Sequence, residues 1–130
     1  MSACGLWLGA QRLVAVIVED DGRLHRPIRA APTAEACAAL FDWLSSRDIH
    51  TLVIGEGNPT LIAQAQAAHL HVQLVPRPWL DAIRSVAGYT RRPHRDSAAL
   101  LARWSITPGL RGLLRECRPT DAPAQQLSLL

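Results

Sequence analysis

Residues 50–75 constrain the fold of this chain more than any other stretch, because they combine a strand pattern, a glycine turn, a helix pattern and a second strand. Residues 51–54 form a short apolar run that suits a strand buried on both faces, and residues 72–75 form the returning strand. Between them, Asn58 and Pro59 supply a helix N-cap and a first-turn proline. Such a βαβ unit requires a parallel strand pair and a right-handed crossover.

The function of such a unit is expected near the carboxyl ends of its strands, where residues 55–58 and 76–79 emerge. The sequence Gly-Glu-Gly-Asn at 55–58 precedes a helix, so its backbone N–H groups are candidates for holding a phosphate. The alternative is a plain turn in which Glu56 is solvated.

The residues before this unit predict an antiparallel meander of three strands. Residues 5–8 and 13–18 are apolar runs, an Asp-Gly turn signal follows, and residues 24–29 alternate polar and apolar side chains. Pro27 cannot donate to a strand ladder, so it places the third strand at a sheet edge.

Four further helices are predicted from caps and periodicity. Thr33 can cap the first, whose apolar face is Cys37, Leu40, Phe41 and Leu44. Pro78 opens a helix that ends near Gly88, Asp96 can cap the next, and residues 107–114 form a last one. The indoles of Trp7, Trp43 and Trp104 are expected in the core.

This order of elements predicts a ribonuclease H-like α/β domain over residues 1–118. Its mixed five-stranded sheet would have the order 3-2-1-4-5, with helices on both faces, and residues 119–130 would form a flexible tail. A small Rossmann-like fold is the alternative, although the opening hairpin argues against a purely parallel sheet.

Composition narrows the cellular setting. No apolar run approaches the roughly 20 residues that span a bilayer, and the N-terminus lacks a secretory pattern, so a cytoplasmic protein without a membrane partner is expected. The three cysteines include no CxxC pair, so neither a disulfide framework nor a cysteine zinc site is predicted.

The positive charge of the chain is carried by arginine alone, and the formal net charge is +3. Arg91, Arg92, His94 and Arg95 form one cluster, whose guanidinium groups can hold a phosphate backbone. Trp79 follows a proline at a strand's carboxyl end and is a candidate for stacking on a base. A solvated basic loop or a protein-binding patch is the alternative use of the cluster.

Three short motifs resemble the YqgF/RuvX-type Holliday-junction resolvases. Residues 7–16 (WLGAQRLVAV) resemble their first hairpin, residues 52–55 their fourth strand with its glycine, and residues 95–101 the start of their last helix. The likeness covers roughly residues 5 to 105. A similar likeness extends to the N-terminal domain of transposases with a DEDD tetrad, through residues 20–22 and 98–104.

Both resemblances imply carboxylates that converge on two divalent metals at a phosphodiester. Trp7 stands where the first-strand aspartate is expected, and an indole cannot coordinate magnesium. On the resolvase pattern, Asp96 is retained while Pro76 and Arg77 replace an acidic pair.

On the transposase pattern, Gly55 replaces a glutamate, with Glu56 one position along, and His94 and Ser97 replace two aspartates. Glu56 and Asp96 are therefore the acidic candidates for catalysis, with magnesium as the cofactor only if the protein is active. The alternative for Asp96 is a purely structural N-cap.

The last five residues, Gln126, Leu127, Ser128, Leu129 and Leu130, resemble the pentapeptide by which bacterial replication and repair proteins bind the sliding clamp. A short peptide at a chain end can enter a pocket without unfolding the domain. Alternatively, these leucines fold back onto the domain.

The sequence thus predicts a catalytically degenerate accessory protein of DNA replication, repair or recombination that binds DNA and the sliding clamp. One alternative is an active magnesium-dependent, structure-specific nuclease. Another is a structural subunit that forms a homodimer through the sheet edge near Pro27.

Overall fold

The computed structural model describes residues 2–9, 12–87, 93–106 and 114–117. At its centre is a mixed sheet of six strands in the order β3-β2-β1-β4-β5-β6. The strands are β1 (Ala3–Leu8), β2 (Leu13–Val18), β3 (Ile28–Ala30), β4 (Thr51–Gly55), β5 (His71–Val75) and β6 (Arg115–Cys117). The helices are α1 (Ala34–Ser46), α2 (Pro59–Ala67), α3 (Arg77–Ala87) and α4 (Pro93–Ile106).

The topology confirms the predicted order of the first five strands. β1 is antiparallel to β2 and parallel to β4, and β4 is parallel to β5. The unit at residues 50–75 is therefore the βαβ unit that its pattern predicts. Because β1, β4 and β5 are parallel, their carboxyl ends lie along one border of the sheet, here called the carboxyl edge.

The sheet has one strand more than predicted. β6 pairs antiparallel with β5, with Gln73 opposite Glu116. Its sequence, Arg-Glu-Cys, has no alternating apolar pattern, so the sequence does not distinguish it from a loop.

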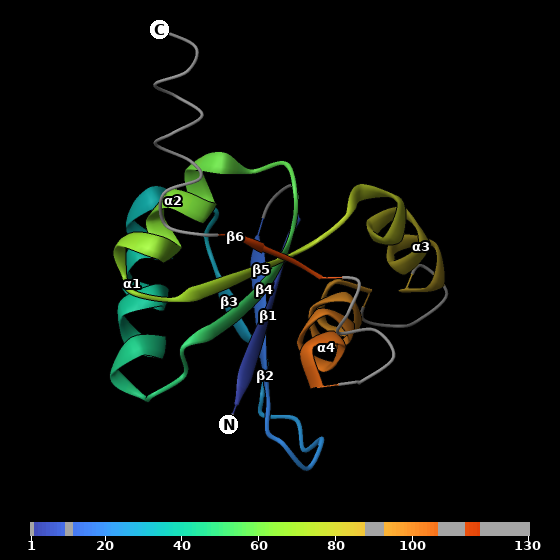
Figure 1. The fold of residues 1–130 in the computed structure, drawn as a ribbon, viewed down its shortest axis with the longest axis horizontal. Coiled ribbons are helices and arrows are strands. Elements are labelled where there is room, and N and C mark those ends of the chain that lie inside the picture. The colour runs from blue at the N-terminus through green and yellow to red at the C-terminus, as the bar shows by residue number, and fades with distance from the viewer. Residues whose placement is uncertain (1, 10–11, 88–92, 107–113, 118–130) are drawn as a thin grey trace, which may run out of the picture.

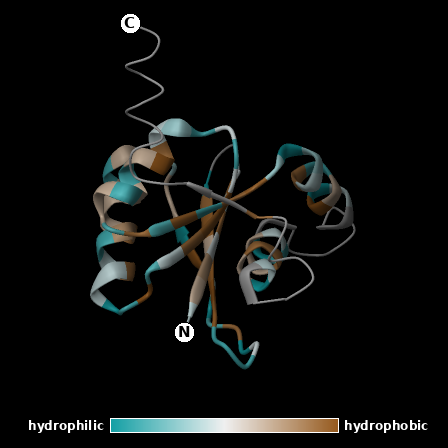
Figure 2. Cartoon of the chain, viewed as in Figure 1, coloured by the Kyte–Doolittle hydropathy of each residue, from teal (hydrophilic) through white to brown (hydrophobic). Residues whose placement is uncertain are grey.

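Helices cover both faces of the sheet, as predicted (Figure 1). α1 and α2 lie on one face, and α3 and α4 on the other. The strands between them are largely apolar (Figure 2). Two buried clusters result: one contains Leu6, Phe41, Leu52 and Leu74, and the other contains Trp7, Val53 and Leu101.

The caps of α1 and α2 are those that the sequence predicts. The Thr33 hydroxyl accepts a hydrogen bond from the Ala36 N–H at 3.2 Å, and the Asn58 side chain accepts one from the Leu61 N–H at 3.2 Å. The predicted apolar face of α1 is buried: Cys37, Leu40, Phe41 and Leu44.

Close packing at Gly5 holds α4 against β1. A Cβ atom on Gly5 would lie 2.0 Å from the Ala98 carbonyl oxygen and 2.4 Å from the Ala102 nitrogen. Only a residue without a side chain allows the helix backbone to approach the strand this closely. Gly5 therefore fixes the position of α4 on the sheet.

Two expectations about single elements are wrong. The edge strand β3 spans only Ile28–Ala30, with an isolated bridge between Val18 and Leu24, because Pro27 interrupts the ladder. Trp43 is 39% exposed rather than buried, and the Arg47 guanidinium lies over its ring at 5.3 Å from the centroid. Trp43 therefore lies on the outer side of α1.

The predicted helix at residues 107–114 lies outside the described residues except for Leu114, and the predicted tail at 119–130 lies entirely outside them. Within the described ranges, every helix is too short or too polar to traverse a lipid bilayer.

Candidate functional site

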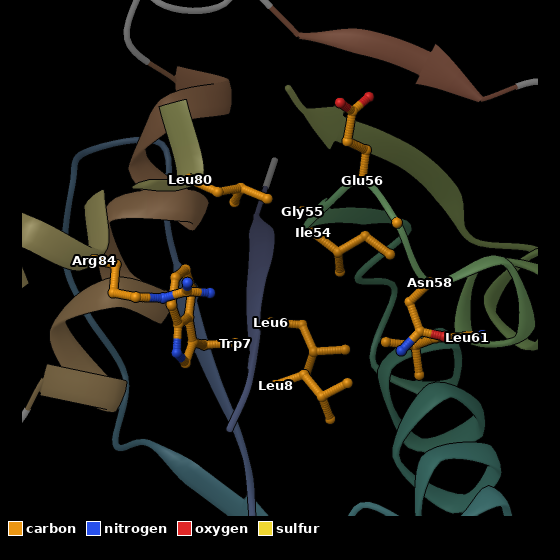
Figure 3. A pocket seen from close by; sticks show the side chains of 11 residues that line it. Leu6, Trp7, Leu8, Ile54, Gly55, Glu56, Asn58, Leu61, Leu80 and Arg84 are labelled. Carbon is orange, nitrogen blue, oxygen red and sulfur yellow. Dashed lines mark hydrogen bonds between the residues drawn. The ribbon is translucent and has the colours of Figure 1, made fainter. Parts of the chain in front are cut away.

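A pocket of about 220 Å³ opens at the carboxyl edge, at the ends of β1 and β4 (Figure 3). The turn after β4 forms one side and α3 another. The apolar part of its lining comes from Leu6, Trp7, Leu8, Ile54, Leu61 and Leu80. Polar groups come from Glu56, Asn58 and Arg84. The predicted location of the site, where residues 55–58 leave the sheet, thus coincides with a pocket.

Trp7 and Arg84 form a cation–π pair in this pocket. Trp7 is the second-last residue of β1 and is 8% exposed. The Arg84 guanidinium carbon lies 5.7 Å from the centroid of the indole ring, within the range of a cation–π contact. The Arg84 side chain is 71% exposed and lies 3.9 Å from an Asp81 carboxylate oxygen. A positive charge therefore lies at the carboxyl end of β1.

Arg84 is the functional candidate that the sequence interpretation missed. It follows Leu80 by four residues, a spacing that places both side chains on one side of α3. Since Leu80 also lines the pocket, the helical period is the signal by which Arg84 could have been found.

Glu56 stabilises the start of α3. Its Oε1 atom accepts a hydrogen bond from the Arg77 N–H at 3.0 Å, and its own N–H donates to the Val75 carbonyl at 3.1 Å. A carboxylate at a helix N-terminus satisfies an unpaired N–H group and interacts favourably with the helix dipole. Glu56 is therefore not simply a solvated turn residue, because its carboxylate joins the β4–α2 turn to α3.

Asp96 does not cap α4. The helix begins at Pro93, so Asp96 lies within the first turn. Its Oδ1 atom accepts hydrogen bonds from Arg95 Nε at 3.2 Å and Nη2 at 3.0 Å. The N-cap prediction failed because a proline in the first helical turn needs no N–H partner, which allows the helix to begin earlier.

The carboxylates do not form the ligand set of a two-metal site. Glu56 accepts a hydrogen bond from Arg77 in α3, whereas Asp96 accepts one from Arg95 in α4. Within the part of the chain that the structure describes, no group of three or more His, Cys, Asp or Glu side chains could hold a metal ion. Trp7 and Arg84 offer no oxygen ligand, which magnesium requires. The donors at this pocket therefore do not fit a pair of magnesium ions.

The predicted basic cluster is only partly described. Arg91 and Arg92 lie outside the described residues, as does the His94 side chain, although the His94 backbone is part of α4. The Arg95 side chain is 39% exposed and pairs with Asp96. The structure therefore describes only Arg95 of the four side chains.

Trp79 lies in the first turn of α3 and is 42% exposed. Its ring meets that of Trp104 edge to face, with 5.9 Å between centroids and 66° between planes. The contact fixes the orientation of Trp79, and the exposed part of the side chain remains a candidate for stacking. The predicted clamp-binding residues, 126–130, lie outside the described residues.

A second hollow, of about 400 Å³, adjoins the pocket along the carboxyl edge. It lies between the N-terminal ends of α1 and α2 and shares Leu8, Asn58 and Leu61 with the first pocket. The Gln64 side-chain amide donates to the Ala34 carbonyl at 3.0 Å and joins the two helices there. The carboxyl edge is thus hollowed beyond the pocket itself.

Comparison with known proteins gives similarity at the level of the fold. No protein-family model matches the chain, and no curated protein sequence does. Two solved structures of Thermus thermophilus RuvC are similar, one of them in complex with a Holliday junction substrate, with TM-scores of 0.64 for the complex and 0.60 for the other. In both, 11% of residues are identical, 90% of this chain is covered, and 99% or 100% of the RuvC chain is covered. The fold is therefore ribonuclease H-like.

Proposed function

We propose that this protein is a catalytically degenerate, ribonuclease H-like accessory protein of DNA replication, repair or recombination. It binds the DNA phosphate backbone at the carboxyl edge and does not cleave it. The observation that carries the proposal is the pair of Trp7 and Arg84 at the end of β1, where the family resemblance calls for a carboxylate.

A Trp–Arg pair in place of a carboxylate disfavours two-metal cleavage for two reasons. An indole supplies no oxygen ligand, so it cannot position a magnesium ion between the attacking and leaving oxygens. The Arg84 guanidinium adds a positive charge that repels a divalent cation and attracts an anion. The site therefore favours phosphate over metal.

DNA is the proposed nucleic acid for two reasons. The similar structure of Thermus thermophilus RuvC is a complex with a Holliday junction substrate. In addition, the sequence places Arg91 and Arg92 just before α4, the helix that packs on β1. Of the clustered side chains, Arg95 contributes less free charge, because it is paired with Asp96.

The test is a titration of a fluorescent four-way junction and of single-stranded DNA at several salt concentrations. We expect wild-type affinity to fall steeply with salt, because bound arginines release counterions from the phosphates. The double variant Arg91→Ala/Arg92→Ala should flatten the logarithmic slope by roughly 2.

A matched control removes the same charge elsewhere. Arg26→Ala/Arg29→Ala changes two arginines beside and in the edge strand β3 and should leave the slope at its wild-type value. An equal slope for the wild type and the Arg91/Arg92 variant would remove those residues from the interface. Absence of binding by the wild type would contradict the proposal itself.

The same DNA tests the alternative of an active nuclease. We expect it to stay intact with magnesium or manganese. If the wild type cleaves the DNA and Asp96→Asn does not, the protein is a metal-dependent nuclease with Asp96 as a catalytic residue.

The second part of the proposal concerns the C-terminal tail and is supported by its sequence alone. Gln126 would donate and accept amide hydrogen bonds, while Leu127, Leu129 and Leu130 fill apolar subsites of the sliding clamp. A clamp encircling DNA raises the local concentration of phosphate, so a modest DNA affinity suffices.

Deletion of residues 126–130 should abolish co-elution with a bacterial sliding clamp and leave the melting temperature unchanged. As a control, Thr120→Ala alters the linker and keeps the pentapeptide, so co-elution should persist. A lower melting temperature on deletion would instead assign these leucines to the folded domain.

A further inference from the structure

We propose that Arg84, held over the ring of Trp7, receives a DNA phosphodiester in the pocket at the ends of β1 and β4, as a fixed cation in place of a metal ion. The inference rests on the proposed DNA binding and names the subsite and the residue that grips the phosphate there.

The contact with Trp7 restrains Arg84 at the pocket. Its guanidinium carbon lies 5.7 Å from the centroid of the indole ring, and the forked N–H donors of a guanidinium match the oxygens of a phosphate. The Arg84 side chain is 71% exposed, and its Nη1 atom lies 3.9 Å from an Asp81 carboxylate oxygen. That distance exceeds a hydrogen bond, so a phosphate can replace Asp81 as the nearer partner.

The remainder of the pocket is compatible with an anion. Asn58 marks the N-terminus of α2 at its rim, and the positive end of the helix dipole favours negative charge. Glu56 is the one carboxylate in the lining, and its side chain points away from Trp7 and Arg84 (Figure 3). Its hydrogen bond to the Arg77 N–H holds it there.

The size and lining of the pocket select the part of DNA that enters. At about 220 Å³, it lies below the roughly 300 Å³ at which pockets for drug-sized ligands begin, so it suits a phosphate group better than a whole nucleotide. Leu6, Ile54 and Leu80 provide an apolar wall, whose side chains offer no donor or acceptor to the edge of a base. Arg84 would therefore bind the DNA backbone and would not discriminate between base sequences.

The experiment measures DNA affinity by fluorescence anisotropy in buffer with a chelator, for the wild type, Arg84→Met and Arg84→Gln. Both variants should weaken binding about tenfold and lower the salt slope by about one, as for the loss of one phosphate contact. The wild-type affinity should be the same with the chelator as with magnesium. Arg84→Gln keeps a polar side chain, so it provides the comparison if Arg84→Met is misfolded.

Arg47→Met is the matched control, because the Arg47 guanidinium also lies over a tryptophan ring, that of Trp43, but at the end of α1. It should bind DNA like the wild type. Wild-type affinity in both Arg84 variants would overturn the inference while leaving the proposed DNA binding intact. Loss of wild-type binding in chelator would also overturn it, since a metal would then carry the phosphate.

Discussion

At the scale of single residues, the proposed function depends on Trp7, which stands where the resolvase resemblance calls for an aspartate. The indole lies in the cluster formed with Val14, Val53 and Leu101, so it is part of the core as well as of the pocket wall. The Arg84 guanidinium lies over the ring. A carboxylate at this position would be partly buried beside apolar side chains, so the present surroundings suit an indole better.

Glu56 gives a residue-scale prediction about stability. Glu56→Ala removes the acceptor for the Arg77 N–H and should lower the free energy of unfolding by about 1 kcal/mol, the usual effect of losing a helix N-terminal acceptor. Glu56→Gln keeps an acceptor oxygen and should lose less. Urea denaturation measures both.

Asp42→Ala is the control, because it removes an exposed carboxylate from the middle of α1 and should change stability by less than about 0.5 kcal/mol. Equal stability of Glu56→Ala and the wild type would show that the carboxylate does not support α3.

Glu19 gives a prediction about pH. Hydrogen bonds from Arg23 and His25 lower the pKa of the Glu19 carboxyl below its ordinary value. A lowered folded-state pKa means that the contribution to stability is present above the unfolded pKa, about 4.3, and is lost as pH falls through the folded value. Arg23→Ala should raise the Glu19 pKa in a carboxyl NMR titration, and the same pKa in both proteins would contradict this assignment.

At the scale of elements, the contact of α4 with β1 depends on Gly5. Gly5→Ala would place a Cβ against backbone atoms of Ala98 and Ala102, which cannot move without shifting the helix. We expect a loss of about 3 kcal/mol or more in the free energy of unfolding, at the upper end for overpacked sites. Calorimetry or urea denaturation measures it.

Gly22→Asn is the matched control for this variant. Gly22 has φ +87° and open space around its Cβ position, and asparagine tolerates this region of backbone space. The control should stay within about 1 kcal/mol of the wild type. If Gly5→Ala were equally stable, the close approach of α4 to β1 would be wrong.

The elements also show what the sequence can and cannot predict. The buried face of α1 and the strands at residues 51–55 and 71–75 follow from local periodicity, because apolar spacing alone determines which side chains can be buried together. β6 has three residues and no such spacing, and it becomes a strand only because β5 offers an unpaired edge. A cap at Asp96 would start the helix at residue 97, four residues after its observed start at Pro93.

The sequence likewise predicts some features of the candidate site and not others. Its location at the carboxyl edge followed from the βαβ pattern, and the absence of an aspartate at position 7 is evident in the sequence. The contact between Arg84 and Trp7 is between residues 77 positions apart, so it depends on how α3 packs near β1. No local pattern contains that information.

At the scale of the whole molecule, the layered architecture brings the pocket, the second hollow and the N-terminal ends of α1 and α2 to one edge of the sheet. In the sequence, the basic cluster at residues 91–95 lies at and just before the start of α4, the helix that packs on β1. On the proposed function, a phosphate backbone would contact this edge of the sheet.

The most direct test is a manganese titration of the isotopically labelled protein, followed by NMR. The signals to watch are the Trp7 indole N–H and the Gly55 and Gly57 amides, which border the pocket. Manganese broadens signals near its binding site, so the account predicts no saturable broadening centred on these three groups. Saturable broadening of these signals that Glu56→Gln or Asp96→Asn removes would contradict the account. The protein would then be better described as a metal-dependent nuclease.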